Sequence, residues 1–292
     1  MARTSGLDAA VVSDGVVEKL VKKSCGSFIH AATACRFVRE GGPLAGERLA
    51  HLISAEHLPA RAGTELDRMY TNVLEYSLNA QFDVEETARV QELFGRIVGS
   101  LAVLFDALSP DSLAMMLAEP KGRITSTIGS LQSLVDVPEQ EGRLIRLLHP
   151  SFREFLLDPQ RCSHTMFRID AKTAHRQLLD CCLRVMADHL SRNMCGLGRP
   201  GSRVGDIPRS DVDSKVPFAV QYACRYWFYH LERSGVDPRE HPAVADLLET
   251  RFLFWVEALA LIGRLADGTT MIRLLETRLP VSIPHTLYDT CG

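Results

Sequence analysis

The sequence predicts a fold that is mainly all-α: a helical domain, a second domain of three helices with a small β-hairpin, and a C-terminal helical bundle. In most segments, apolar residues recur at intervals of three and four, which is the spacing of one helix face. Cap residues, glycines and prolines divide these segments into helix-length pieces. Residues 135–148 instead read as two short strands around a polar turn. The domains expected from this order are residues 13–80, 81–158 and 165–280.

The first domain is predicted to contain four helices, over residues 14–23, 27–40, 44–57 and 64–78. Gly41, Gly42 and Pro43 end the second of these helices. In the fourth helix, Tyr70 lies on the apolar face, whereas Asp67 is expected to face away from the core.

The second domain is predicted to be a winged helix, because three helices precede the hairpin. Asp83 can cap the first helix, and Ser109 with Pro110 begins the second. The third helix is expected to carry Ile124, Ile128, Leu131 and Leu134. The two strands of the wing are expected at residues 135–137 and 143–148.

Further helices are predicted after the hairpin. Ser151 is expected to cap a short helix to residue 157, and Asp170 a long one to about residue 193. Residues 196–214 have the composition of a surface loop. Three more helices are expected over residues 217–231, 243–265 and 270–279. The candidate core residues are Phe152, Phe155, Tyr222, Cys224, Trp227 and Trp255.

Composition excludes several classes of protein. The 292 residues carry a net charge of -3, so binding to nucleic acid through the charge of the whole molecule is not expected. Apolar runs such as residues 101–105 and 259–262 are far shorter than the ~18 residues of a membrane span. The start lacks a secretory signal, so we expect a cytoplasmic protein whose eight cysteines, which form no C-x-x-C, are thiols.

Nucleotide-binding motifs are incomplete. Residues 196–201 fit G-x-G-x-x-G, but the predicted helix before them and the predicted loop after them are the wrong context for dinucleotide binding. The sequence contains no G-x-x-x-x-G-K-[ST], the loop that cradles nucleotide phosphates. We therefore expect no catalytic residues and no cofactor in this chain: binding of ADP or ATP would need a P-loop domain.

The sequence offers two possible cysteine-based sites. Residues 221–225 (QYACR) approximate the caspase signature, and His175 lies 49 residues before Cys224. The segment reads as a buried helix, however, where a thiol would be desolvated and unreactive. His175 could join Cys181, Cys182 or His189 at a metal site. Cys182 is seven residues from both histidines, about 10 Å along a helix, which is too far for direct chelation without ligands from elsewhere. A hydrogen-bonded core histidine and no metal are expected.

DNA binding through the winged helix is the main alternative function. Residues 121–161 contain six lysines and arginines and five acidic residues. After Arg123, the third helix presents mainly Ser, Thr and Gln. This is too little positive charge to neutralise several phosphates. Protein partners are therefore expected, and nucleic acid is not.

Residues 147–156 (LLHPSFREFL) resemble the H-x-S-F-x-[DE]-F-[LF] segment that ends the winged helix of NACHT-type signal-transduction NTPases. Further blocks resemble fungal members, which join a NACHT domain to WD or other repeats. These blocks are residues 28–37, 66–70, 222–231 and 255–259. The resemblance covers roughly residues 16–265, although His30 stands where relatives usually have tryptophan.

The resemblance implies a molecular switch. In this family, helical and winged-helix parts fold over a nucleotide held upstream, and a histidine that corresponds to His149 contacts its phosphates. The P-loop, the magnesium-binding acids and the sensor repeats have no counterpart here, so we expect the non-catalytic arm of such a switch, from a partial family member. Its expected partners are the family's NACHT core or an oligomer. An imidazole N–H at a strand-to-helix junction suits a phosphate; alternatively, His149 only caps the helix or packs.

Overall fold

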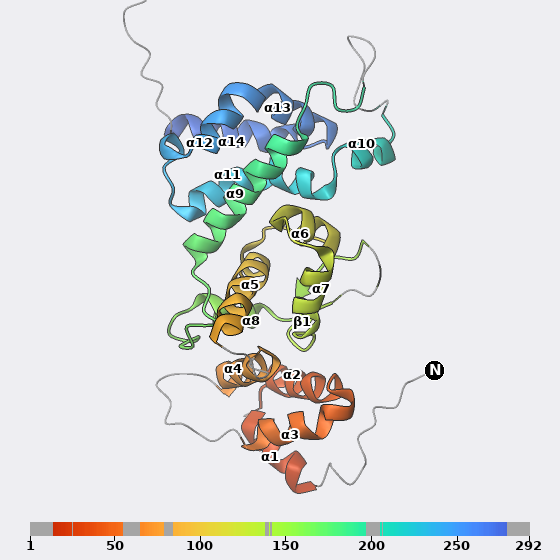
Figure 1. Cartoon of the computed structure of the whole chain (residues 1–292), viewed down its shortest axis with the longest axis vertical. Helices are drawn as coiled ribbons and strands as arrows, with labels where there is room; N and C mark the ends of the chain where they lie inside the picture. The colour runs from red at the N-terminus through yellow and green to blue at the C-terminus, as the bar shows by residue number, and fades with distance from the viewer. Residues whose placement is uncertain are drawn as a thin grey trace, which may run out of the picture. The chain divides into compact units, whose positions relative to one another are not determined.

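The computed structural model describes residues 14–24, 26–54, 65–78, 84–137, 140, 142–196, 205 and 207–278 (Figure 1). The chain divides into two compact units, residues 1–174 and 175–292. Helices dominate both units, and a two-stranded sheet is the only sheet in the described residues. The predicted mainly all-α fold is confirmed. None of the helices in these ranges is long and apolar enough to cross a membrane.

The first unit begins with four helices, α1 (Asp14–Ser24), α2 (Phe28–Arg39), α3 (Ala45–Ser54) and α4 (Glu65–Leu78). The Ser27 hydroxyl caps α2 by accepting from the amide of His30 at 3.3 Å. A short 3-10 helix, η1 (Gly42–Leu44), precedes α3. It starts at Gly42 with a φ of +52°, a conformation that glycine tolerates, so α3 begins one residue later than predicted.

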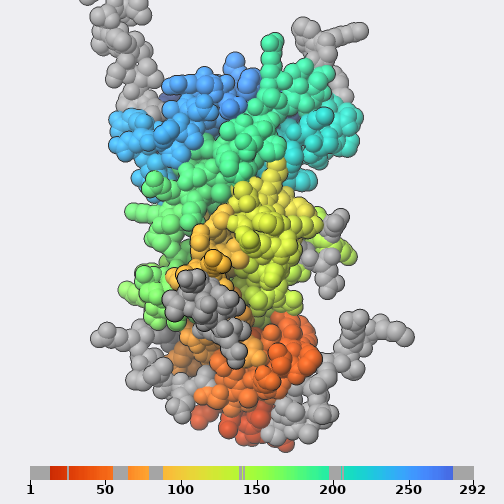
Figure 2. All heavy atoms as spheres, viewed as in Figure 1, coloured from red at the N-terminus to blue at the C-terminus, as the bar shows by residue number. Residues whose placement is uncertain are grey.

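The next elements of this unit are α5 (Val84–Val103), α6 (Pro110–Leu117), α7 (Lys121–Gly129), β1 (Val135–Asp136) and β2 (Arg146–Leu147). Ser109 caps α6, and Pro110 occupies its first turn, as predicted. Helix α7 ends at Gly129, so Leu131 and Leu134 are buried in the turns after it rather than in the helix. Figure 2 shows α6 and α7, in yellow to yellow-green, at the surface of the unit.

The predicted hairpin is present but short. Strands β1 and β2 are antiparallel, with Val135 opposite Leu147 and Asp136 opposite Arg146. The longer second strand predicted from sequence is wrong, because the amide of Ile145 donates to the carbonyl of Leu108 at 2.9 Å and so leaves the hairpin ladder. The winged-helix assignment stays a prediction.

The unit continues with α8 (Pro150–Leu157) and the start of α9 (Ala171–His189). The second unit contains the rest of α9, then α10 (Arg209–Lys215), α11 (Phe218–Ser234), α12 (Pro242–Asp246), α13 (Phe252–Leu261) and α14 (Leu265–Arg278), with short turns η3 (Pro238–Glu240) and η4 (Leu247–Arg251). Two predictions fail here. Helix α10 occupies the end of the predicted 196–214 loop and extends to Lys215, and the single helix predicted over 243–265 is divided.

The helix predicted over residues 243–265 is interrupted both before and after α13. The segment η4 is a turn of π-helix between α12 and α13. At the other end, Gly263 adopts a φ of +69°, and the amide of Arg264 reaches back to the carbonyl of Leu259 at 2.7 Å. This is a left-handed glycine end to a helix. Helix α14 therefore starts at Leu265 instead of at residue 270.

The core of the second unit forms around α11, whose buried residues include Tyr222, Cys224 and Trp227. The rings of Trp227 and Trp255 meet edge to face with centroids 5.8 Å apart, and both side chains are fully buried. The indole N–H of Trp255 donates to the carbonyl of Cys224 at 2.9 Å. Contacts of this kind pack α13 against α11.

Candidate functional site

His149 lies between β2 and α8 and is the N-cap residue of α8. Its backbone is extended, and its Nδ1 accepts a hydrogen bond from the amide of Ser151 at 3.1 Å. The prediction that Ser151 caps this helix was wrong. Pro150 occupies the first helical position, which suits its fixed φ, so the cap falls on the residue before it.

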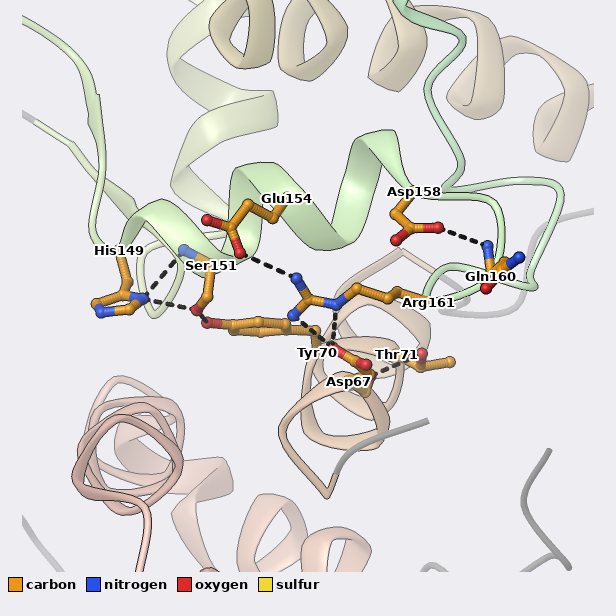
Figure 3. A network of polar contacts seen from close by, with 9 residues as sticks. All are labelled: Asp67, Tyr70, Thr71, His149, Ser151, Glu154, Asp158, Gln160 and Arg161. Carbon is orange, nitrogen blue, oxygen red and sulfur yellow. Dashed lines mark hydrogen bonds and ion pairs between the residues drawn. The ribbon is translucent and has the colours of Figure 1, made fainter. Parts of the chain in front are cut away.

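The His149 ring is the end of a short polar chain. Its Nδ1 lies 2.6 Å from Oγ of Ser151, and that Oγ lies 2.7 Å from the hydroxyl of Tyr70 on α4 (Figure 3). His149 is half-buried, and its Nε2 has no hydrogen-bond partner among the described residues. The ring therefore caps the helix with one nitrogen and leaves the other available.

Tyr70 holds the far end of this chain inside the core. It is 1% exposed, and its ring lies 5.1 Å from that of Phe152 and 5.4 Å from that of Phe155, between centroids. Phe152 and Phe155 are themselves buried on α8. Burial raises the pKa of the Tyr70 hydroxyl, so it stays protonated and can donate.

An ion pair beside this polar chain also joins α4 to the segment after α8. Both Nε and Nη2 of Arg161 lie within 3.0 Å of Oδ1 of Asp67, and Nη1 lies 3.1 Å from Glu154 (Figure 3). Hydrogen bonding to Asp67 raises the pKa of Arg161. Asp67 is only 2% exposed, so the prediction that it faces away from the core was wrong. Helical spacing could not reveal the distant arginine that makes its burial acceptable.

The basic residues of α7 are engaged in ion pairs. Lys121 lies 2.8 Å from Asp111, and Arg123 lies 2.8 Å from Glu119. Each cation of this helix thus has a carboxylate beside it. The charge offered to a DNA phosphate backbone at α7 is correspondingly small.

His175 and Cys224 are buried separately from this site, in the second unit. Nδ1 of His175 lies 2.8 Å from Nδ1 of His230, and Nε2 of His230 lies 2.8 Å from the Tyr222 hydroxyl. Burial raises the pKa of the Cys224 thiol to about 12, so it is protonated at neutral pH. These contacts give a hydrogen-bonded core histidine, and a buried thiol of this kind is a poor nucleophile.

The cysteine and histidine pattern of α9 was the other possible metal site. Cys182 is fully buried, and His189 donates from Nδ1 to the carbonyl of Val185 at 2.9 Å. Within the described ranges, no three His, Cys, Asp or Glu side chains are grouped so that they could hold a metal ion. Most of the glycine-rich run 196–201 lies outside the described residues.

Comparison with known proteins gives one informative match. The chain is similar to the vegetative incompatibility protein HET-E-1 of Podospora anserina, with 26% identity over 277 residues. The match covers 87% of this chain but only 19% of HET-E-1, so the chain spans about a fifth of that relative's length. This similarity supports a relation to the NACHT family. No protein-family model matches the chain, and no solved structure matches it significantly.

Proposed function

We propose that this chain is a non-catalytic regulatory and interaction arm of a NACHT-type switch, in which His149 senses a nucleotide held by a separate P-loop domain. The observation that carries the proposal is the position of His149. One ring nitrogen is tied to the start of α8, while the other has no partner among the described residues. The similarity to a fungal incompatibility protein supports a signalling role.

The chemistry of sensing follows from the ring. With Nδ1 used as an acceptor, the proton of a neutral imidazole resides on Nε2, which is then a donor. Phosphate oxygens accept such hydrogen bonds, and a bond to a charged group contributes about 1.5–3 kcal/mol. His149 can thus favour the nucleotide state that places a phosphate oxygen at Nε2, without any catalytic group in this chain.

Protein partners fit this role better than nucleic acid. A sensing arm must contact the domain that holds the nucleotide, which is a NACHT core of its own family or another copy in an oligomer. The pairing of Lys121 with Asp111 and of Arg123 with Glu119 weakens the case for DNA binding. A steeply salt-dependent complex in a mobility-shift assay would favour the DNA-binding alternative.

Release of a fluorescent ADP analogue tests the proposal. A recombinant P-loop domain of the NACHT family is loaded with mant-ADP, and release is followed with and without this chain. We expect the chain to slow release and His149→Ser to restore faster release, by about tenfold, because one charge-assisted hydrogen bond is lost. Serine keeps the N-cap acceptor, so the helix start is retained.

A matched control separates sensing from folding. His164 is also half-buried, and its Nδ1 accepts from the amide of Met166 at 3.3 Å, so it makes the same kind of local bond away from α8. His164→Ser should leave mant-ADP release unchanged. Equal release rates with the wild-type chain and with His149→Ser would contradict nucleotide sensing by His149.

A further inference from the structure

We infer that Ser151 and Tyr70 are positioning residues that hold His149 in the tautomer with its proton on Nε2, so that the free edge of the ring is a hydrogen-bond donor. This rests on the proposed function for its ligand, a nucleotide phosphate. It also adds a regulatory element, because the donor at His149 then depends on a residue of another helix, α4.

The backbone of Ser151 sets the role of Nδ1 of His149. The amide of Ser151 lies 3.1 Å from Nδ1 of His149, and an amide N–H can only donate. In this arrangement Nδ1 offers its lone pair, and the Ser151 hydroxyl, 2.6 Å from the same nitrogen, adds to the preference for this tautomer as a second donor. The single proton of the neutral ring is then on Nε2, the nitrogen that has no partner in the described part of the chain.

The hydroxyls of Ser151 and Tyr70 continue this chain of hydrogen bonds. Because Nδ1 carries no proton, Oγ of Ser151 at 2.6 Å must be the donor of that contact. Its lone pairs are then available to the Tyr70 hydroxyl, which lies 2.7 Å away and donates in turn. It follows that the hydrogen bonds run in one direction, from Tyr70 to Ser151 to His149. Figure 3 shows the three side chains in this order.

The packing of Tyr70 keeps the start of this chain of hydrogen bonds in place. The Tyr70 ring is packed against Phe152 and Phe155 of α8. Arg161, held by Asp67 of α4 and Glu154 of α8, ties the same two helices together. Separating α4 from α8 would remove Tyr70 from Ser151 and release the Ser151 hydroxyl. A ligand that needs a donor at Nε2 therefore favours the arrangement in which α4 is docked on α8.

Nitrogen NMR tests the inference on the chain alone. In histidine-labelled protein, long-range proton–nitrogen correlations identify which ring nitrogen carries the proton, at a pH well above the ordinary pKa of histidine. We expect His149 to be protonated on Nε2 in the wild type. Ser151→Ala should increase the fraction protonated on Nδ1, and Tyr70→Phe should do so to a smaller extent, while Ser151→Thr, which keeps a hydroxyl, should behave as wild type.

The control and the contradicting results are defined by the same spectra. Thr71 neighbours Tyr70, but its hydroxyl donates to the backbone of Asp67 and takes no part in this chain of hydrogen bonds, so Thr71→Val should leave the His149 tautomer unchanged. A wild-type His149 protonated on Nδ1 would overturn the inference even if a variant failed to fold. Identical tautomers in the wild type, Ser151→Ala and Tyr70→Phe would also overturn it.

The mant-ADP measurement distinguishes this inference from the proposed function. If positioning matters for sensing, Ser151→Ala and Tyr70→Phe should speed mant-ADP release less than His149→Ser does. If the tautomer shifts as expected but His149→Ser has no effect on release, the proposed function fails and the positioning roles stand. Wild-type release with Ser151→Ala, alongside fast release with His149→Ser, would contradict a role for Ser151 in sensing.

Discussion

Trp227 shows how the second unit is held together at the scale of a single residue. Its side chain is fully buried and contacts the ring of Trp255 edge to face. Its indole Nε1 is buried without a hydrogen-bond partner among the described residues, unlike Nε1 of Trp255. The contribution of Trp227 to stability therefore comes from packing rather than from hydrogen bonding.

Replacing Trp227 with alanine should lower the free energy of unfolding by about 3–5 kcal/mol, because a large cavity would remain between α11 and α13. Urea denaturation measures the change. Trp227→Phe should cost much less, since it keeps an aromatic ring and loses no hydrogen bond. An unchanged urea midpoint for Trp227→Ala would show that α11 is not packed as described.

The buried His230 should make the protein less stable in acid. Desolvation, helped by nearby His175, lowers its pKa from 6.5 to about 3. The unfolded chain therefore binds one more proton than the fold between these values, and stability should fall as the pH drops from the ordinary histidine pKa towards 3, by about 1.4 kcal/mol per pH unit. Urea unfolding of the wild type and His230→Gln at several pH values checks this. Equal pH slopes would contradict it.

At the scale of elements, the packing of α14 on α13 depends on a glycine. A Cβ at Gly268 would approach Cδ1 of Leu259 to 2.5 Å, and Leu259 is fully buried. We expect Gly268→Ala to destabilise the protein by about 1–3 kcal/mol despite the better helix propensity of alanine. Thermal or urea unfolding measures the effect.

The matched control for Gly268 lies inside α5. A Cβ at Gly95 would meet nothing within 4 Å, so Gly95→Ala should raise stability by about 0.5–1 kcal/mol. Adding Leu259→Val to Gly268→Ala should cost less than the two single changes together, because the valine no longer reaches the new methyl group. Stabilisation by Gly268→Ala alone would show that the two helices do not meet there.

Local signals in the sequence could predict most helices but not all their ends. Ser109 with Pro110 marked the start of α6 correctly, because a cap and a first-turn proline act within a few residues. Gly263 is a local signal for the end of α13, because glycine readily adopts the left-handed conformation that the structure has there. Helix α10 lies in a segment whose glycines, prolines and serines are typical of loops, so composition alone could not reveal it.

The candidate site could be predicted only in part. The H-x-S-F pattern placed His149 at a strand-to-helix junction, which is where the structure has it. The contact of Ser151 with Tyr70 joins residues 81 positions apart and arises from the packing of α4 on α8. No local pattern encodes that contact. The same is true of Arg161, which allows Asp67 to be buried.

At the scale of the whole molecule, the polar site and the aromatic core belong to different compact units. The hydrogen bonds that join Tyr70, Ser151 and His149 lie in the first unit, and the packed rings of Trp227 and Trp255 lie in the second. The sequence holds no phosphate-cradling loop, and its similarity to HET-E-1 covers a fifth of that protein. Under the proposed function, the chain acts on a nucleotide that another domain binds.

Titration of ADP into the purified chain, by calorimetry, tests this central claim most directly. We predict weak or undetectable binding by the chain alone, and no turnover of ATP by the same sample, because His149 supplies one donor and the sequence contains no phosphate-cradling loop. Low-micromolar binding of ADP that His149→Ser abolishes would contradict the account, since it would show that this chain contains a complete nucleotide site.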